Sequence, residues 1–280
     1  MAAAACALAS CESPAEPLNL PPRAERGGFV SRDTCAMCHP GEVASHSATF
    51  HRTMTQAAEP GAVLGNFNSV RVQDRGQAFV FRTQAASFWV DEVAASSAES
   101  DGVQTVAGQR DGRESHRVEM TTGSHHTQAY WFRNARGVLQ QVPWVWLVKE
   151  QRWIPNADSF LVDPQWANQG SMGRWDDNCF RCHSTGWQRD SATPQDHSTV
   201  GDLGISCGAC HGPAESHVEV NHNPFRRWWK SWANTGDETV ANARRMDASR
   251  AQAICAQCHS ESLARVDAQP NEPFRAGQRH

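Results

Sequence analysis

The sequence has no apolar stretch long enough to span a bilayer, which argues against a membrane-spanning helix. It also lacks an excess of positive charge. The 26 basic residues are outnumbered by 30 acidic ones, and the formal net charge of −4 excludes a generally basic nucleic-acid-binding protein. Tyrosine is nearly absent, with Tyr130 alone beside 11 tryptophans and 11 phenylalanines. Nucleic acid is therefore not an expected partner.

Cysteine, by contrast, recurs in one pattern. The pentapeptide Cys-x-x-Cys-His occurs four times, at 35–39, 179–183, 207–211 and 255–259. It is the attachment site of a c-type haem, where two thiolates add to the porphyrin vinyl groups and the histidine ligates the iron. We therefore expect four covalently bound c-type haems. The attaching cysteines are Cys35, Cys38, Cys179, Cys182, Cys207, Cys210, Cys255 and Cys258, and the proximal iron ligands are His39, His183, His211 and His259.

Zinc is the alternative cofactor, because the pairs at Cys179 and Cys207 resemble the two knuckles of a zinc ribbon. Zinc does not require a histidine directly after every second cysteine. With 13 histidines in 280 residues, four such neighbours arise by chance at about five in a million. A disulfide framework is also a poor explanation, since cysteines two residues apart close no loop of useful length.

The other two cysteines, Cys6 and Cys11, lie in an alanine-rich leader. The run Leu8-Ala-Ser-Cys11 resembles a lipobox, in which a signal peptide is cut and the new N-terminal cysteine takes lipid. A signal peptide also needs a basic region and a longer apolar region, so a disordered leader remains the alternative. Haem attachment takes place outside the cytoplasm. We expect a periplasmic or extracellular protein, with a membrane anchor at Cys11 if the lipobox is used.

The expected fold class is α+β, an irregular multihaem cytochrome c fold in which helices surround four stacked haems. Short alternating runs such as Val70–Val72, Phe79–Phe81, Phe88–Val90 and Val138–Val142 predict a β-rich insert over about 62–163. Helices are expected over 41–57 and 238–254, and the sites at Cys179 and Cys207 are expected to be stacked neighbours. The predicted parts are a leader (1–11), an exposed linker (12–28), a tetrahaem domain (29–265) and a C-terminal tail (266–280).

Four haems replace much of the apolar core that a chain of this length otherwise needs, which suits its 39% of hydrophobic residues. The many tryptophans suggest indole rings packed on porphyrin edges, with ordinary core packing as the default for any single one.

Two longer runs resemble the cytochrome c-554 type of multihaem cytochrome. They are Asn178-Cys-Phe-Arg-Cys-His-Ser-Thr-Gly-Trp187 and Gly204-Ile-Ser-Cys-Gly-Ala-Cys-His-Gly-Pro-Ala-Glu-Ser-His-Val218. The likeness extends over roughly 30–262 and is strongest to the branch attached to tetratricopeptide repeats. No such repeat follows the last motif here. The resemblance implies an exported tetrahaem electron-transfer protein whose irons are mostly ligated by two histidines.

Nine histidines remain as candidates for the second axial position. His217 follows the turn that starts at His211-Gly-Pro, and the family pattern places a ligand there. His51 matches the family's histidine-then-methionine segment, with Met54 as a thioether alternative, and either His125 or His126 is similarly placed. His46, His116 and His197 are further candidates, whereas His222 and His280 are expected to be solvated.

Two classes of function follow. A carrier passes electrons between redox proteins through closely packed, six-coordinate haems. An oxidoreductase instead keeps one iron open for a small nitrogen or sulfur species and needs polar donors over it, for which the basic cluster 226–230 is a candidate. That cluster also suits a solvated face or a docking patch. A cytochrome filament, in which subunits lend each other a histidine, is a third class.

Overall fold

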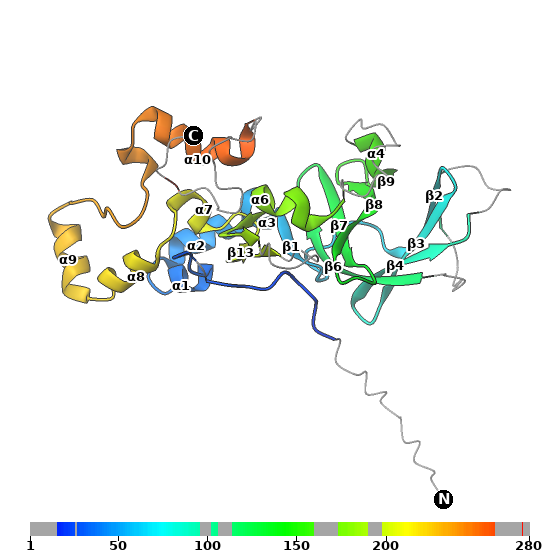
Figure 1. Cartoon of the computed structure of the whole chain (residues 1–280), viewed down its shortest axis with the longest axis horizontal. Helices are drawn as coiled ribbons and strands as arrows, with labels where there is room; N and C mark the ends of the chain where they lie inside the picture. Colours follow the sequence, from blue (N-terminus) through cyan, green and yellow to red (C-terminus); the bar gives the residue numbers. More distant parts are fainter. Residues whose placement is uncertain are drawn as a thin grey trace, which may run out of the picture.

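The structure, a computed structural model, describes residues 16–25, 27–95, 102–105, 114–159, 173–189, 198–260 and 276. The molecule is elongated, with a large antiparallel sheet at one end and a group of short helices at the other (Figure 1). This arrangement confirms the α+β class. Among the described residues, none of the helices has the length and apolar character needed to cross a membrane.

The large sheet contains nine of the described strands. Eight follow the order β5-β2-β3-β4-β6-β7-β8-β9, and β1 pairs with β6. These strands are β1 (Thr55–Ala57), β2 (Asn68–Asp74), β3 (Gln77–Gln84), β4 (Ser87–Val93), β5 (Gly102–Thr105), β6 (Glu114–Thr122), β7 (Thr127–Arg133), β8 (Leu139–Leu147) and β9 (Arg152–Pro155). The alternating runs of the sequence lie in β2, β3 and β4, and all but the first residue of the fourth run lies in β8.

Two neighbouring hairpins have tight turns of different composition. The turn between β2 and β3 places Arg75 and Gly76 at φ of 49° and 79°. The turn between β3 and β4 places Ala85 and Ala86 at φ of 46° and 58°. Two residues with positive φ form the type I′ turn whose twist matches a hairpin. The glycine of the first turn signals it in the sequence, whereas nothing in the alanine pair does.

The sheet is held together mainly by aromatic rings. Phe81 stacks on Trp153 with ring centroids 4.1 Å apart, and Phe67 packs edge-on against both and against Tyr130. Trp144 and Trp146 are buried in the same cluster. The suggestion that indoles pack on porphyrin edges is therefore wrong for these tryptophans, which pack on one another.

The helices at the other end are short. They are α1 (Arg32–Ala36), α2 (Pro40–Ser47), α3 (Phe50–Thr53), η1 (Trp175–Cys179), α6 (Phe180–His183), α7 (Cys207–His211), α8 (Glu215–Asn221), α9 (Pro224–Trp232), η2 (Ala243–Arg245) and α10 (Ala248–His259). The helix predicted over 41–57 is interrupted, because its last residues form β1 and pair with β6. The helix predicted over 238–254 begins later, after Asp247, whose side chain accepts a hydrogen bond from the backbone of Arg250. A further short helix, α4 (Asn156–Ser159), follows β9.

A second apolar cluster joins the two ends of the molecule. Met120 and Trp131 of the sheet pack with Trp175, Phe180 and Leu203 of the segment around α6. Two pairs of very short strands lie in this segment: β10 (Ser184–Thr185) with β13 (Asp202–Leu203), and β11 (Gln188–Arg189) with β12 (Ser198–Thr199). Residues 16–25, expected to be an exposed linker, lie along this junction with Leu20 packed on the cluster. The cluster thereby fixes the helical end on the sheet.

Candidate haem sites

Each Cys-x-x-Cys-His motif lies on or directly beside one turn of helix. The first spans the end of α1 and the start of α2, the second η1 and α6, the third is α7, and the fourth ends α10. Residues three and four apart share a helix face. A helical turn therefore directs both thiols and the histidine of a motif to the same side, as attachment to one macrocycle requires.

The four motifs are gathered at the helical end of the molecule. The thiols of Cys35 and Cys207 are close enough to interact, and this interaction raises the pKa of Cys35 and lowers that of Cys207 to about 6. Cys182 and Cys258 form the second such pair, which lowers the pKa of Cys182 to about 7 and raises that of Cys258. The first motif thus touches the third through its thiols, and the second touches the fourth.

The second and third motifs, expected to be neighbours, are connected by backbone pairing and not by their thiols. The strand β10 that follows the second motif pairs with β13, which precedes the third. The Thr185 hydroxyl then accepts a hydrogen bond of 2.8 Å from the backbone of Ser206. In the described part of the chain, no three His, Cys, Asp or Glu side chains converge as a metal-ion site.

His39 of the first motif faces His217 of α8. Their ring centroids are 6.3 Å apart and their planes differ by 25°. Two imidazoles that share one iron, each with its nitrogen about 2 Å from the metal, have centroids about 6 Å apart. The spacing of this pair therefore fits an iron between the rings.

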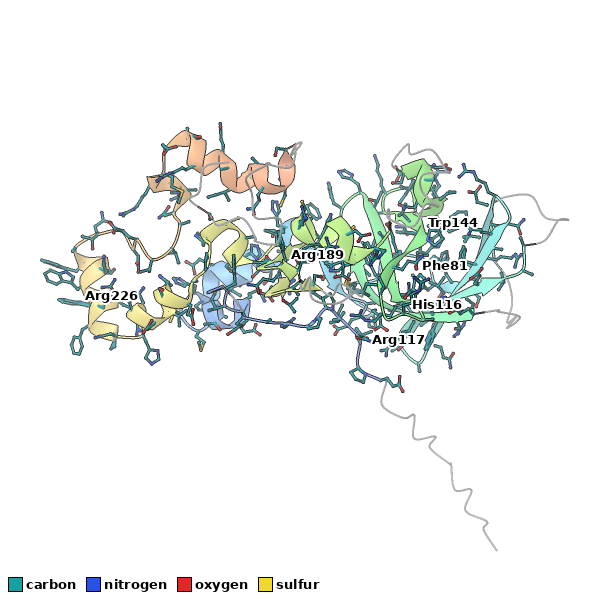
Figure 2. All side chains as sticks on the ribbon, in the orientation of Figure 1. Phe81, His116, Arg117, Trp144, Arg189 and Arg226 are labelled. Carbon is teal, nitrogen blue, oxygen red and sulfur yellow. The ribbon has the colours of Figure 1, made fainter. Side chains whose placement is uncertain are left out.

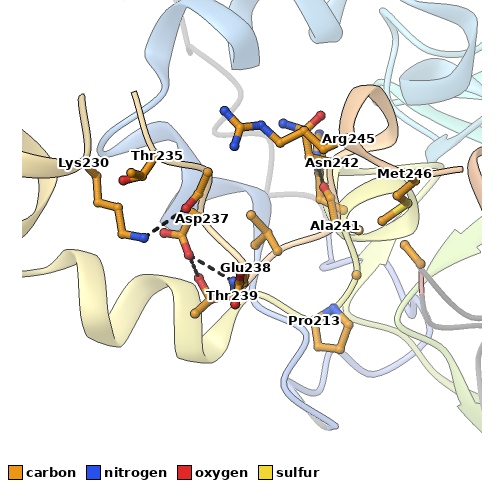
Figure 3. Close-up of a pocket in the computed structure, with 15 residues that line it drawn as sticks. Pro213, Lys230, Thr235, Asp237, Glu238, Thr239, Ala241, Asn242, Arg245 and Met246 are labelled. Carbon is orange, nitrogen blue, oxygen red and sulfur yellow. Dashed lines mark hydrogen bonds between the residues drawn. The ribbon is translucent and has the colours of Figure 1, made fainter. Parts of the chain in front are cut away.

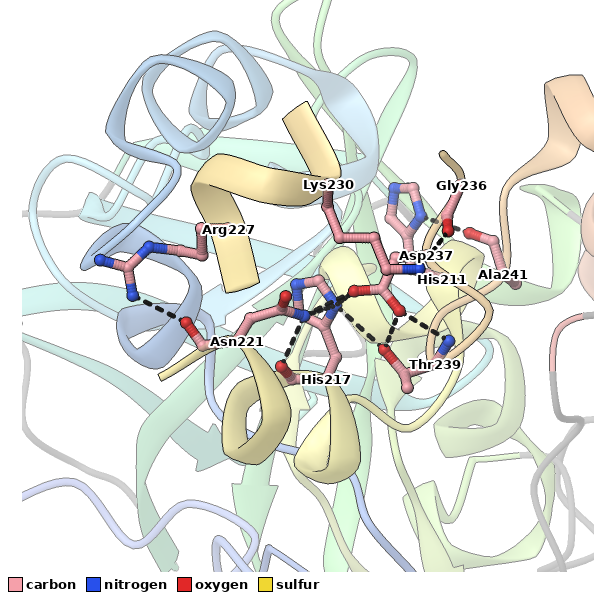
Figure 4. A network of polar contacts seen from close by, with 9 residues as sticks. All are labelled: His211, His217, Asn221, Arg227, Lys230, Gly236, Asp237, Thr239 and Ala241. Carbon is pink, nitrogen blue, oxygen red and sulfur yellow. Dashed lines mark hydrogen bonds and ion pairs between the residues drawn. The ribbon is translucent and has the colours of Figure 1, made fainter. Parts of the chain in front are cut away.

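Polar partners surround the Nδ1 atom of His217 (Figure 4). It lies 3.3 Å from the Asp237 carboxylate, 3.3 Å from the Thr239 hydroxyl and 3.1 Å from the Asn221 amide. Metal-bound histidines characteristically donate their other ring N–H to such a group, which fixes the tautomer. With Nδ1 occupied by Asp237, the Nε2 atom of His217 is the nitrogen left to ligate a metal.

The Asp237 carboxylate is itself firmly held. Burial alone would raise the pKa of Asp237, but hydrogen bonds from Thr239 and Asn221 and the charge of His217 outweigh burial and hold that pKa well below its usual range. The sequence gives no signal for this partner, because Asp237 lies twenty residues beyond His217 on a loop. Asn221 is four residues along α8 and shares the face of His217, so its contact follows from helical spacing.

His51 and His259 form a second facing pair. Their ring centroids are 6.0 Å apart and the planes are nearly perpendicular, at 86°. The separation again matches two imidazoles on one iron, and rotation about the metal–nitrogen bonds allows either relative orientation. His51 follows the first motif and His259 belongs to the fourth. In both pairs the second histidine thus comes from a segment that follows a different motif.

His211 of the third motif lies beside a cavity of about 820 Å³ (Figure 3). Its Nδ1 donates a hydrogen bond of 2.8 Å to the carbonyl of Ala241, so Nε2 remains free for a metal. The volume lies within the range of about 300–1,000 Å³ that is usual for cofactor sites. Its polar lining includes Lys230, Asn242 and Arg245, and Met246 also borders it.

His183 of the second motif is the most enclosed of the four proximal candidates. Burial lowers the pKa of His183, and its Nδ1 atom is buried with no hydrogen-bond partner among the described residues. His46 also has a buried Nδ1 without a partner. Burial, followed by the nearby charges of Arg32 and Arg52, lowers the pKa of His46. Buried ring nitrogens are normally paired, so these two imidazoles are unusual among the described histidines.

The remaining candidates lie elsewhere. His125 and His126 are exposed on the loop between β6 and β7, where His125 packs on Phe50 with centroids 4.0 Å apart. Neither is in ring contact with a motif histidine. His116 lies in the sheet against Phe132 (Figure 2). His222 is exposed, as expected. Cys11, His197 and His280 lie outside the described residues.

Comparison with known proteins gives one match of sequence and two of structure. Two solved structures are similar at 17% identity: the outer cell wall cytochrome OcwA (TM-score 0.48, covering 89% of this chain and 41% of that one) and an undecahaem cytochrome from the S-layer of Carboxydothermus ferrireducens (TM-score 0.46, 85% and 26%). The chain therefore spans less than half of either protein. No curated protein matches significantly. Residues 163–212, which contain the second and third motifs, match the family model "Cytochrome c554 and c-prime". The resemblance to the cytochrome c-554 type is confirmed over this segment.

Proposed function

We propose that this chain is an exported electron-transfer protein that carries four covalently bound c-type haems. The observation that carries the proposal is the presence of four Cys-x-x-Cys-His motifs, all at one end of the molecule and in pairwise contact. Haems on such motifs lie close enough to pass electrons from one to the next. When bound, the haems supply reversible one-electron chemistry, and the protein sets their spacing, burial and axial ligands.

In this proposal the eight motif cysteines attach the macrocycles, and His39, His183, His211 and His259 bind the irons from one side. His217 is the second ligand of the iron held by His39, since their rings stand at the required spacing. His51 is the second ligand of the iron held by His259. The geometry around an iron that is ligated by two histidines changes little on reduction, which favours fast electron transfer. One of His125 and His126 remains a proposed ligand, with no partner ring assigned.

The partners are redox proteins, one donor and one acceptor, and neither is identified by the residues described here. Attachment of c-type haem requires export, so we place the protein in the periplasm or outside the cell. Cys11 would then carry lipid if the run that precedes it is processed as a lipobox. Lipid labelling of the exported protein, compared with its Cys11→Ala variant, tests the anchor separately from export.

The haem stoichiometry tests the proposal directly. After maturation by a c-type haem assembly system, the intact mass should exceed that of the polypeptide by four haem groups, and these should survive denaturation because the bonds are covalent. Cys182→Ala should leave at most three fully attached groups. A protein that contains zinc and no haem would contradict the proposal.

An oxidoreductase with one open haem is the second candidate. The cavity beside His211 favours it, because Lys230, Asn242 and Arg245 supply hydrogen-bond donors for a small nitrogen or sulfur oxyanion. Carbon monoxide distinguishes the two functions. A carrier with four six-coordinate irons should bind almost none when reduced, whereas an enzyme with an open iron should rapidly bind one equivalent.

A further inference from the structure

Helix α9 is amphipathic in an unusual orientation. Its apolar residues, Phe225, Trp228, Trp229 and Trp232, stand at positions i, i+3, i+4 and i+7 and therefore form one stripe. Such a stripe normally faces the protein core. Here the four side chains are 80%, 63%, 54% and 70% exposed, and they are four of the seven large exposed apolar residues among those described.

The polar side of the helix is the side that holds it to the chain. Arg227 donates hydrogen bonds of 2.7 and 3.1 Å to the carbonyls of Asn221 and His222, and Lys230 donates one of 3.0 Å to the carbonyl of Gly236. The tryptophan rings contact one another instead: Trp228 stacks on Trp232 at 6.4 Å with planes 13° apart. The rings thus form a convex ridge, and α9 lies at the far end of the molecule from the sheet (Figures 1 and 2).

The segment around α9 is positively charged, whereas the chain as a whole is negatively charged, and this difference indicates an anionic partner. Between Glu219 and Asp237 there is no acidic residue, while α9 contributes Arg226, Arg227 and Lys230. The chain as a whole nevertheless has a net charge of −4. An anionic surface would attract α9 and repel the rest of the molecule, so electrostatics favour an orientation in which only this end makes contact.

We propose that α9 binds the surface of an anionic lipid bilayer. Its aromatic ridge enters the headgroup region, where tryptophan is preferred, while the positive charges of α9, within a Debye length of the surface, attract the anionic lipids. A convex ridge fits a deformable interface without a preformed groove, which is why a bilayer is favoured over an acidic protein. This surface is separate from any lipid on Cys11 and does not depend on the number of haems.

The test uses the haem-loaded full-length protein with Cys11→Ala, so that no covalent lipid contributes. The protein is sedimented with vesicles of phosphatidylcholine alone or of phosphatidylcholine mixed with phosphatidylglycerol, and haem absorbance left in the supernatant reports the free fraction. We expect sedimentation with the anionic vesicles only, and release by added salt.

Two variants separate the contribution of the aromatic residues to membrane binding from that of the positive charges. Trp228→Ser with Trp232→Ser should weaken binding at least about tenfold, because apolar area no longer enters the interface. Arg226→Gln with Arg227→Gln should weaken it by about fivefold per charge. The matched control is Leu64→Ser, which alters an exposed apolar residue of the sheet end and should bind like the parent.

Three results would overturn the proposal. The first is a parent protein that stays in solution with anionic vesicles, including the case in which it binds soluble polyglutamate, as a site for an acidic protein would. The second is equal sedimentation with neutral and anionic vesicles. The third is a change in the haem absorption spectrum of the tryptophan variant, which would mean that the rings cover a haem.

Discussion

His217 lies on α8 with Nδ1 beside Asp237, and this contact determines which ring nitrogen is available to a metal. If the other nitrogen ligates the iron held by His39, His217→Ala should convert one low-spin haem to high-spin, because neither water nor alanine replaces the field of an imidazole. The potential of that haem should rise. Electron paramagnetic resonance and redox titration measure both effects.

The control for this variant is His222→Ala, which removes an exposed imidazole five residues further along. It should leave the spin state of every haem unchanged. An unaltered spectrum in His217→Ala would show that the ligand assignment is wrong, whatever the spacing of the two rings.

Asp237 allows a separate prediction, because it contacts Nδ1 of the proposed ligand His217 and is not itself a proposed ligand. A carboxylate on the Nδ1 proton increases the electron density of the ring and favours the ferric state. Asp237→Asn should keep the haem low-spin while raising its potential by tens of millivolts. If the potential does not move, Asp237 has only a structural role in the loop, and the loss should then appear in thermal stability alone.

Tyr130, the only tyrosine of the chain, allows a prediction about the stability of the sheet. The Tyr130 hydroxyl is buried, accepts a hydrogen bond of 2.8 Å from the backbone of Gly65, and donates one of 2.6 Å to Gln128. Tyr130→Phe removes the partner of the partly buried N–H of Gly65. We expect a loss of about 1–3 kcal/mol in the free energy of unfolding, measured by urea denaturation. A loss below about 0.5 kcal/mol would indicate that water replaces the hydroxyl.

At the scale of elements, the two tight hairpins provide a matched pair. Ala86 has φ of 58°, where an alanine Cβ is strained and glycine is not. Ala86→Gly should therefore stabilise the sheet by about 0.5–1 kcal/mol despite the greater freedom of glycine when unfolded. Gly76→Ala should destabilise it, because φ is 79° there although the added methyl meets no atom within 4 Å. We expect the melting temperatures of the two variants to shift by equal amounts in opposite directions.

The elements also show how far the sequence alone could lead. Alternating apolar residues were sufficient for β2, β3 and β4, because each buries one face on a common core. The same kind of local pattern failed for residues 55–57, where pairing with β6 overrides a helical composition. The start of α10 was predictable in principle, since Asp247 is a typical N-cap residue.

The candidate haem sites also contain residues that the sequence predicts and residues that it does not. Covalent chemistry requires a fixed spacing, so the eight cysteines and their four histidines can be found without a structure. Partner histidines come from distant segments, and among the histidines that the structure describes only His217 and His51 are brought to motif rings. Asp237 and the carbonyl of Ala241 act through contacts across a loop, for which no local pattern exists. The boundaries of the leader, the tetrahaem domain and the tail stay predictions.

Taken as a whole, the molecule has its largest apolar cluster in the sheet. The aromatic cluster of the sheet contains fifteen buried residues, whereas α1, α3, α7 and α8 contain no buried residue. Ordering a chain segment costs about 1–2 kcal/mol per residue, which short exposed helices cannot recover alone. We therefore predict that attached cofactors complete the core of the helical half, while the sheet half folds without them.

This difference predicts how the protein behaves before and after haem attachment. Protein made without the c-type assembly system should lose residues 32–53 and 207–259 rapidly to protease, while β2–β9 (68–155) persist as a folded fragment. The haem-loaded protein should resist cleavage in both halves, because an iron held by His39 and His217, or by His259 and His51, would join segments that are far apart in sequence. Mass spectrometry of timed digests identifies the fragments. If the haem-free helical half resisted protease as well as the loaded one, its short helices would be stable through contacts of their own, and the role of the haems as a core would be refuted.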